Sequence, residues 1–248
     1  MRLADKVAII TGGGSGIGKV SSYLFAKEGA KIAVADIDAV GGEETVATIQ
    51  ADGGEAIFIH TDISIVPEVE HLVKVTMDTF GKIDILFNNA GICNVSTPVE
   101  NIEEAWWDRI YAVNVKGIFL GVKYVIPEMK KVGGGVIINT ASLAGHRPVK
   151  DNSAYASSKG AVITLTKALA LELAPYNIRV NCINPAITET PMIEILSEEQ
   201  KKASISRTPL GGRAARPEEI AYAAVYLASG ESPFLTGASI NMDGGRSI

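Results

Sequence analysis

The chain has 248 residues, 47% of them hydrophobic, with 23 basic and 28 acidic side chains and a formal net charge of −5. This composition supports one large domain with a core, and the acidic balance excludes the basic surface that nucleic acid or an anionic membrane would require. Two cysteines and the absence of an 18-residue apolar run exclude a disulfide framework and a membrane span, and they predict a cytoplasmic protein.

Short β-branched runs alternate with longer stretches of helical periodicity along the chain. The predicted strands are residues 7–10, 32–35, 56–59, 83–87, 136–138, 179–183 and 238–241. The predicted helices are residues 17–29, 39–51, 66–80, 102–131, 154–174 and 217–229. Several strands are apolar at consecutive positions, as burial on both faces requires. The alternation predicts an α/β fold with a doubly wound parallel sheet of about seven strands and helices on both faces.

A glycine-rich turn follows the first predicted strand and opens the first helix. It has glycines at positions 12, 16 and 18, whereas the strict Gly-x-Gly-x-x-Gly spacing is absent. Glycines let the backbone approach a pyrophosphate, whose charge is then stabilised by the helix N-terminus. The alternative is a merely flexible turn, but the strand-turn-helix context favours a dinucleotide site.

An acidic residue, Asp36, ends the second strand 18 residues after Gly18. A carboxylate there accepts hydrogen bonds from the adenosine ribose hydroxyls. A 2′-phosphate would meet like charge at a cost of about 3 kcal/mol, which favours NAD over NADP by about two orders of magnitude. Asp62, after the third strand, lies at the same sheet edge and is expected to hold the adenine amino group. The alternative for Asp36 is a solvated acid at a strand end.

Three polar residues form a candidate acid/base group. Tyr155 and Lys159 are one helical turn apart, and Ser142 ends the strand before their helix. A phenol with a pKa of about 10 needs roughly 4 kcal/mol of preferential phenolate stabilisation to act near pH 7, which one ammonium about 4 Å away would supply. Tyr23 and Lys27 repeat the spacing, but no polar strand end accompanies them. We interpret that second pair as a surface coincidence.

Taken in order along the chain, these motifs resemble the classical short-chain dehydrogenase/reductase family. The resemblance rests on Gly12-x-x-x-Gly16-x-Gly18, Asn88-Asn89-Ala90-Gly91, Asn114, Ser142, Tyr155 and Lys159. It implies a single Rossmann-like domain over residues 1–248 that binds NAD. It also implies hydride transfer between the nicotinamide and a secondary alcohol or ketone, in a homotetramer built from helices 102–131 and 154–174 and the C-terminal strand.

The resemblance assigns roles to individual residues. It implies that Tyr155 is the general acid/base, that Ser142 orients the substrate oxygen, and that Lys159 lowers the tyrosine pKa and holds the nicotinamide ribose. Asn114 matches an asparagine whose helix distortion keeps a water in a proton relay. The cofactor residues expected from motif and resemblance together are Gly12, Ser15, Gly16, Ile17, Gly18, Asp36, Ile63, Asp62, Asn89, Ala90, Gly91, Tyr155, Lys159, Pro185, Thr188 and Thr190.

The chain departs from the family pattern after the sixth strand. Ala186 stands where the family usually has a glycine after Pro185. Because a Cβ disfavours a positive φ, the family's usual turn conformation is not expected to carry over to this position. Thr188 stands where an aliphatic residue usually contacts the carboxamide, whereas Thr190 matches the usual hydroxyl.

The substrate side is expected to be variable in sequence and mobile. A lid is predicted at about residues 188–213, with a polar-faced helix inside it. His146 and Arg147 lie near the expected mouth, where they either bind a polar or anionic substrate group or form an ordinary exposed loop pair. The other expected wall residues are Ile92, Cys93, Asn94, Leu143, Ala144, Asn152, Ile187 and the segment 192–207.

The leading hypothesis is therefore an NAD-dependent oxidoreductase for a small-molecule alcohol or ketone. The alternatives are a 3-oxoacyl-thioester reductase of the same fold and a non-catalytic NAD-binding regulatory protein. Metal catalysis has little support, because no ligand-spaced His or carboxylate cluster occurs. Hydrolase chemistry is also disfavoured, because the Gly-x-Ser-x-Gly elbow is absent around Ser142.

Overall fold

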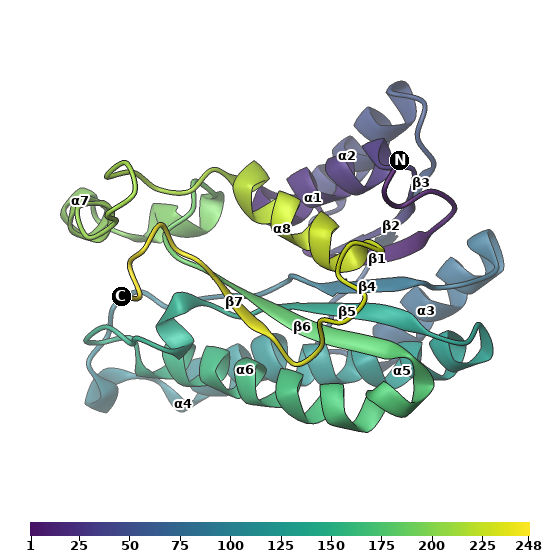
Figure 1. Ribbon diagram of the computed structural model, residues 1–248. Coiled ribbons are helices and arrows are strands. Elements are labelled where there is room, and N and C mark those ends of the chain that lie inside the picture. The colour runs from purple at the N-terminus through teal and green to yellow at the C-terminus, as the bar shows by residue number, and fades with distance from the viewer.

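A computed structural model describes residues 1–248 and contains a single seven-stranded parallel sheet with the strand order β3-β2-β1-β4-β5-β6-β7 (Figure 1). The predicted fold class is confirmed, and each predicted strand is present. The strand over residues 83–87 begins two residues later than predicted. The strands are β1 (Val7–Thr11), β2 (Lys31–Asp36), β3 (Ala56–His60), β4 (Ile85–Asn88), β5 (Gly135–Thr140), β6 (Ile178–Pro185) and β7 (Ser239–Met242).

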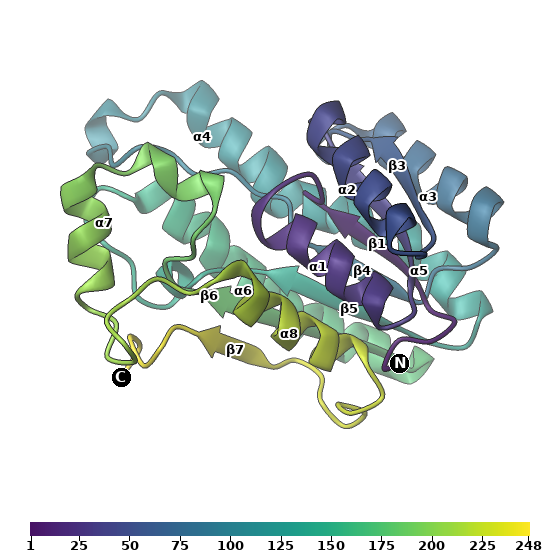
Figure 2. The same ribbon diagram turned by 90° about the horizontal axis from the view of Figure 1, so that it is seen from above.

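Helices cover both faces of the sheet. In Figures 1 and 2 one layer holds α1 (Gly16–Lys27), α2 (Ala39–Ala51) and α8 (Pro217–Ala228). The other layer holds α3 (Val66–Phe80), α5 (Gly117–Lys131) and α6 (Ser153–Leu173). Beyond the carboxyl ends of the strands lie α4 (Glu104–Tyr111) and α7 (Glu198–Ile205). Short 3₁₀ helices occupy Val99–Asn101, Leu143–Gly145, Ala174–Tyr176 and Pro191–Ile195.

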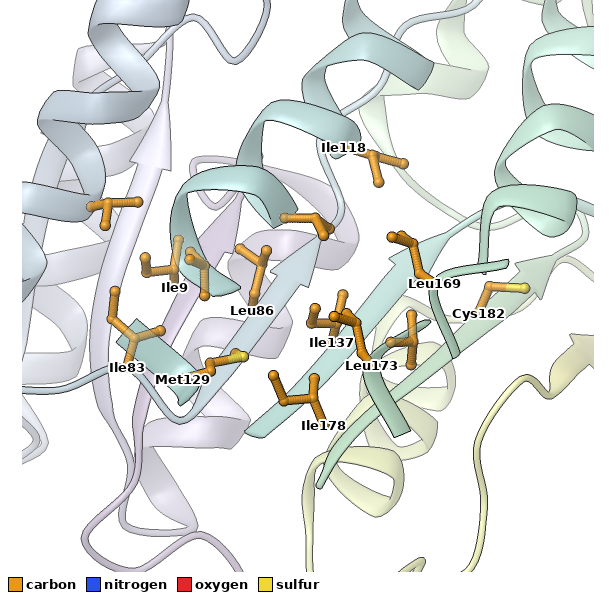
Figure 3. Packing of buried hydrophobic residues seen from close by; sticks show 14 of the residues in the cluster. Ile9, Ile83, Leu86, Ile118, Met129, Ile137, Leu169, Leu173, Ile178 and Cys182 are labelled. Carbon is orange, nitrogen blue, oxygen red and sulfur yellow. The ribbon is translucent and has the colours of Figure 1, made fainter. Parts of the chain in front are cut away.

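The core has two halves because the strands alternate their side chains between the faces. Ile9 of β1 joins a cluster of 22 buried residues under α3, α5 and α6, whereas Ala8 and Ile10 join a cluster of 19 under α1, α2 and α8. Figure 3 shows the first cluster, with Met129 of α5 and Leu173 of α6 pointing toward the sheet. Every residue of β1 is buried, which explains why its sequence is apolar at consecutive positions.

Strand order sets the position of the site. The chain winds outward from β1 to β2 and β3, then returns to place β4 on the other side of β1. The carboxyl ends of β1 and β4 therefore border a crevice at the topological switch point, where open α/β sheets bind ligands.

The prediction of one continuous helix over residues 102–131 is wrong in detail. The segment consists of α4, a π-helical turn at Ala112–Lys116 and α5. A π turn inserts an extra residue into the hydrogen-bond ladder, which the 3.6-residue pattern of apolar side chains does not reveal. The span Glu104–Lys131 is long and apolar enough to cross a membrane by composition alone, but half of its most apolar window is buried inside the protein. We interpret it as a core segment.

Candidate active site

One cavity of about 790 Å³ runs along the carboxyl ends of the strands. It unites residues from the β1–α1 turn, β2, β5, α6 and the segments after β4 and β6. Two predicted site residues, Gly18 and Asn114, stand behind its wall. The predicted residues that line it are Gly12, Ser15, Gly16, Ile17, Asp36, Asp62, Ile63, Asn89, Ala90, Gly91, Ser142, Tyr155, Lys159, Pro185, Thr188 and Thr190.

The β1–α1 turn needs its glycines for distinct reasons. Gly12 and Gly16 have positive φ angles of 66° and 51°, which side chains other than glycine disfavour. A Cβ on Gly18 would lie 2.0 Å from the Gly12 carbonyl oxygen, so this glycine lets α1 pack against the turn. The turn is therefore a backbone cradle at the N-terminus of α1, which is suited to a pyrophosphate.

Thr11, at the end of β1, joins this turn to the segment after β4. Its hydroxyl accepts hydrogen bonds from the backbone N–H groups of Asn89 (3.0 Å) and Ala90 (3.1 Å). The Asn89 amide donates to the carbonyl oxygens of Thr11 and Gly12, at 3.2 and 3.3 Å. Sequence reasoning missed Thr11 as a support residue, because no feature of the sequence alone distinguishes a strand-end threonine that bridges two strands.

The Asp36 carboxylate is fixed at the end of β2. One oxygen accepts from the Gly14 N–H (2.8 Å) and the other from the Asp38 N–H (2.9 Å). These bonds hold the carboxylate beside the glycine-rich turn, on the cavity wall. No lysine or arginine forms an ion pair with it. A fixed carboxylate without a cationic partner is the arrangement that accepts ribose hydroxyls and repels a 2′-phosphate.

Asp62 lines the cavity but already has partners. Its carboxylate accepts from the Ser64 N–H and hydroxyl, at 2.9 and 2.6 Å, and from the Arg109 guanidinium at 3.0 Å. Burial by itself raises the pKa of Asp62. These hydrogen bonds and the Arg109 charge lower it by more, so the net pKa lies below the ordinary value of an aspartate. The sequence prediction did not foresee this pairing, because Arg109 approaches from α4, 47 residues later.

Ser142, Tyr155 and Lys159 meet on one wall of the cavity. Ser142 follows β5 and accepts the Ala144 N–H at 3.1 Å through its hydroxyl. Tyr155 and Lys159 lie in the first two turns of α6, with the ammonium 5.8 Å from the phenol ring centroid. The Lys159 ammonium is buried and donates to the Thr140 carbonyl oxygen at 2.8 Å. Thr140 is a second support residue that the sequence did not reveal.

The direction of the Tyr155 pKa shift corrects our expectation. Burial raises the pKa of Tyr155 to about 12, although the hydrogen bond with Ser142 lowers it. Burial also lowers the pKa of Lys159 to about 8. The expectation placed a charge near the phenol without counting desolvation, which disfavours both charged groups. The protein alone therefore holds a neutral phenol beside an ammonium that loses its proton more readily than an ordinary lysine.

Asn114 lies in the π turn and is fully buried. Its side chain accepts from the Ile92 N–H (2.8 Å) and donates to the Ile92 carbonyl oxygen (2.9 Å) and the Ser158 hydroxyl (3.0 Å). The expected helix distortion at this asparagine is confirmed. Asn114 connects the π turn to α6 and to the segment after β4, so it positions the wall that carries Tyr155 and Lys159.

The segment after β6 closes the cavity opposite the glycine turn. Ala186 has no positive φ, so the Cβ that replaces the family's glycine causes no backbone strain. Thr188 donates to the Ala186 carbonyl oxygen at 3.0 Å, and Thr190 to that of Thr188 at 3.3 Å. A Cβ built on Gly16 would lie 3.1 Å from the Thr190 methyl group, which shows how closely this segment approaches the turn.

The rest of the cavity is a mixed wall. Asn94 is buried, and its side-chain oxygen has no hydrogen-bond partner. The side-chain oxygen of Asn152 is also buried without a hydrogen-bond partner. Both residues were expected in the substrate wall and both line the cavity. Arg246, near the end of the chain, also lines it and was not predicted, since nothing in the sequence places that tail beside the site. His146 instead lies within hydrogen-bond distance of Ser239 and Asn184, away from the cavity lining.

Comparison with known proteins places the chain among oxidoreductases. A family model described as Enoyl-(Acyl carrier protein) reductase matches residues 12–247. An uncharacterised oxidoreductase of Thermotoga maritima is 44% identical over 254 residues, covering 99% of this chain and 98% of the relative. A cyclopentanol dehydrogenase of Comamonas sp. is 39% identical over 245 residues, covering 98% of each.

A solved structure gives the same result. The 3-ketoacyl-(acyl-carrier-protein) reductase from Brucella melitensis, crystallised with NADH, superimposes with a TM-score of 0.94 at 40% identity. The match covers 99% of this chain and 100% of that one. The likeness thus includes every element that borders the cavity.

Proposed function

Since the chain belongs to the classical short-chain dehydrogenase/reductase family, we propose that it is an NAD-dependent oxidoreductase that interconverts a secondary alcohol and its ketone, with Tyr155 as general acid/base. The observation that carries the proposal is the convergence of Ser142, Tyr155 and Lys159 in the same cavity as the glycine-rich turn. A turn alone supports only nucleotide binding, whereas the added polar group supports chemistry on a bound oxygen.

The cavity residues fit a nicotinamide dinucleotide. The glycine turn offers the backbone cradle for a pyrophosphate, and the Asp36 carboxylate would accept hydrogen bonds from the adenosine ribose hydroxyls. Lys159 and Thr190 also line the cavity, and in this proposal they hold the nicotinamide ribose and carboxamide. When bound, the oxidised cofactor supplies a positively charged ring that accepts a hydride.

Residues of the chain itself accept the proton of the substrate hydroxyl. In the oxidising direction the substrate hydroxyl gives its proton to the Tyr155 oxygen while Ser142 orients the reacting oxygen by a hydrogen bond. Because burial raises the pKa of Tyr155 to about 12, the phenolate needs positive charge nearby before it can act as a base. Lys159 supplies part of that charge, and the Thr140 carbonyl oxygen fixes its ammonium on the same wall.

Asp36 supports NAD as the preferred cofactor. Its carboxylate is held in place by two backbone N–H groups and lacks a cationic partner, so a 2′-phosphate there would face unscreened like charge. The structure of a relative with NADH is consistent with this preference.

Reduction of 3-oxoacyl thioesters is the second candidate. The likeness to the Brucella ketoacyl reductase, at 40% identity over nearly the whole chain, favours it. The likeness to a cyclopentanol dehydrogenase, at 39% identity, favours small alcohols. Rates with NAD and secondary alcohols, compared with rates for NADH and a 3-oxobutyryl thioester, distinguish the two.

Three further properties complete the proposal. The whole chain acts as one cofactor-binding and catalytic domain. The segment 188–213 is its lid, since α7 in this segment has no buried residue and so has little to hold it against the rest of the protein. A capping box between Ser197 and Gln200 stabilises the start of α7 within the lid. The enzyme assembles as a homotetramer. It works in the cytoplasm, which agrees with two free cysteines, Cys93 and Cys182.

Substitution of Tyr155 tests the assignment. Tyr155→Phe removes only the hydroxyl, so we expect kcat to fall by about 10² to 10⁴ while NADH binding stays within about twofold. The measurement is NADH absorbance for turnover and NADH fluorescence titration for binding. Tyr23→Phe, in the other Tyr-x-x-x-Lys pair, is the matched control and should keep full activity. Retained turnover in Tyr155→Phe would refute the role.

A further inference from the structure

We call the part of the cavity that Arg207 and Arg246 line its outer end. It is built from two parts of the chain that lie far apart in sequence. Arg207 follows α7, and Arg246 stands two residues before Ile248. In Figure 2 the chain leaving α7 passes close to the C-terminal segment. The Leu210 N–H donates to the Gly244 carbonyl oxygen at 2.9 Å, which joins these segments directly. Both arginines line the cavity.

We propose that the substrate carries an anionic group, a carboxylate or a phosphate, which Arg207 and Arg246 bind at the outer end of the cavity while its carbinol carbon lies at Tyr155. This proposal rests on the function proposed above and narrows its substrate class. It adds a second point of recognition to an alcohol-binding site.

Neither guanidinium has a partner within the chain. Arg207 and Arg246 form no ion pair, although seven lysines and four other arginines do. Neither donates a side-chain hydrogen bond, whereas Arg147 beside them donates to the backbone oxygens of Arg246 (3.2 Å) and Ile248 (3.4 Å). Arg147 therefore holds the C-terminal segment in place, and the other two keep their donors free.

Charge is unevenly distributed along the cavity. Its two acidic side chains, Asp36 and Asp62, both belong to the end expected for adenosine. The charge of Asp243 raises the pKa of Arg246, but the oxygens of Asp243 already accept the N–H groups of Gly245 and Ser247 at 3.0 and 2.8 Å. No Asp or Glu side chain lines the outer end, whereas Arg147, Arg207 and Arg246 do, and this excess of basic side chains favours a ligand of opposite charge.

The surroundings of Arg246 disfavour its positive charge. Burial lowers the pKa of Arg246, and the nearby charge of Arg207 lowers it further. Arginine stays protonated at physiological pH, so the repulsion persists in the free protein. A bound anion removes it, and the planar guanidinium matches carboxylate and phosphate oxygens in a bidentate manner.

A series of hydroxy acids, CH₃–CH(OH)–(CH₂)n–COO⁻ with n from 1 to 4, and their methyl esters test the proposal. We expect at least one acid to exceed its ester in kcat/KM by about tenfold or more, the effect of a charged hydrogen bond. Arg207→Gln and Arg246→Gln should each bring that ratio close to one. Lys202→Gln removes the same charge from α7 outside the cavity lining and should leave the ratio unchanged.

Binding supplies a readout that does not need turnover. Calorimetric titration of the NADH-loaded protein with the preferred acid should show a Kd that rises about tenfold or more in Arg246→Gln and stays unchanged in Lys202→Gln. Esters oxidised as well as acids would overturn the anion site and leave the proposed function standing. Arginine-dependent acid binding without oxidation would support the site and refute the function. Preference for a neutral 3-oxobutyryl thioester over every acid would also overturn the anion site.

Discussion

The Asp36 side chain connects cofactor choice to the shape of the turn. The same carboxylate that would receive the ribose also accepts the Gly14 N–H, so its removal changes both charge and turn. Ile37 is next in sequence, lines the cavity and is 58% exposed, which makes it a suitable position for a cation.

We predict that Asp36→Ala combined with Ile37→Arg shifts the NADP to NAD ratio of kcat/KM upward by about 100-fold, because about 3 kcal/mol of repulsion is removed and a phosphate partner is added. Initial rates with each cofactor measure the ratio. Ile37→Arg alone is the control, since it adds the cation and keeps the carboxylate, and it should shift the ratio less. An unchanged ratio in the double variant would count against a ribose contact at Asp36.

The lowered pKa of Lys159 has a consequence for stability. Its pKa falls from 10.5 in the unfolded chain to about 8 in the folded one because burial disfavours the ammonium. Below pH 8 the lysine is charged in both states and folding bears the whole desolvation cost. Between pH 8 and 10.5 the unfolded chain holds more protons, so the free energy of unfolding rises with pH.

We therefore predict that the free energy of unfolding of the wild type, minus that of Lys159→Met, rises by about 2 kcal/mol between pH 8 and pH 10. Urea unfolding at several pH values gives both quantities. Taking the difference removes the opposite trend of Tyr155, whose raised pKa makes the folded state less favourable above pH 10. A flat or falling difference would show that the buried ammonium is not desolvated as the structure indicates.

Among the elements, the β1–α1 turn is the most tightly constrained. Helix α1 packs so closely on the turn that a single Cβ at Gly18 would overlap the Gly12 carbonyl oxygen and approach the Asn89 amide at 2.6 Å. Backbone atoms cannot move aside like the end of a flexible side chain, so the turn itself must open.

We predict that Gly18→Ala destabilises the protein by about 1–3 kcal/mol and weakens NADH binding by about tenfold or more. Thermal unfolding and NADH fluorescence titration measure the two effects. Gly230→Ala is the matched control, since its backbone φ is not positive and a Cβ there meets nothing within 4 Å. Normal NADH affinity in Gly18→Ala would mean that the turn does not hold the pyrophosphate.

The helices also show which structural features the sequence patterns predict and which they miss. Helix α3 has the bounds predicted for it, residues 66–80, because Pro67 favours the first turn and Gly81 adopts the left-handed cap with φ 77°. The π turn around Asn114 was not visible as a break, since apolar residues continue on both sides of it. Only the resemblance to a known family indicated a distortion there.

At the scale of the whole molecule, the sheet could be predicted and the partners of its site could not. Strands buried on both faces leave a plain apolar signal, and the carboxyl ends of neighbouring parallel strands must meet at one edge. That logic brings Asp36, Ser142 and Tyr155 to one cavity. The pairing of Asp62 with Arg109 and the approach of Arg246 to Arg207 depend on how loops cross that edge, for which no local pattern exists.

The proposed homotetramer depends on faces that the single chain leaves open. In Figure 1 no element covers the outer side of α5 and α6, and Leu171 of α6 is 80% exposed there while Phe119 of α5 is 49% exposed. Phe234, in the connection before β7, is fully exposed. Large apolar side chains on faces that the resemblance assigns to subunit contacts favour burial against further copies.

We predict that light scattering gives a mass four times 26.1 kDa for the wild type and a smaller assembly for Leu171→Glu, because a carboxylate buried in an apolar interface costs several kcal/mol. Val40→Glu places the same charge at a residue of α2 that is 68% exposed on the opposite layer, and it should leave the mass unchanged. If the wild type is a monomer at micromolar concentration, or if both variants dissociate alike, the exposed face of α6 is not the contact.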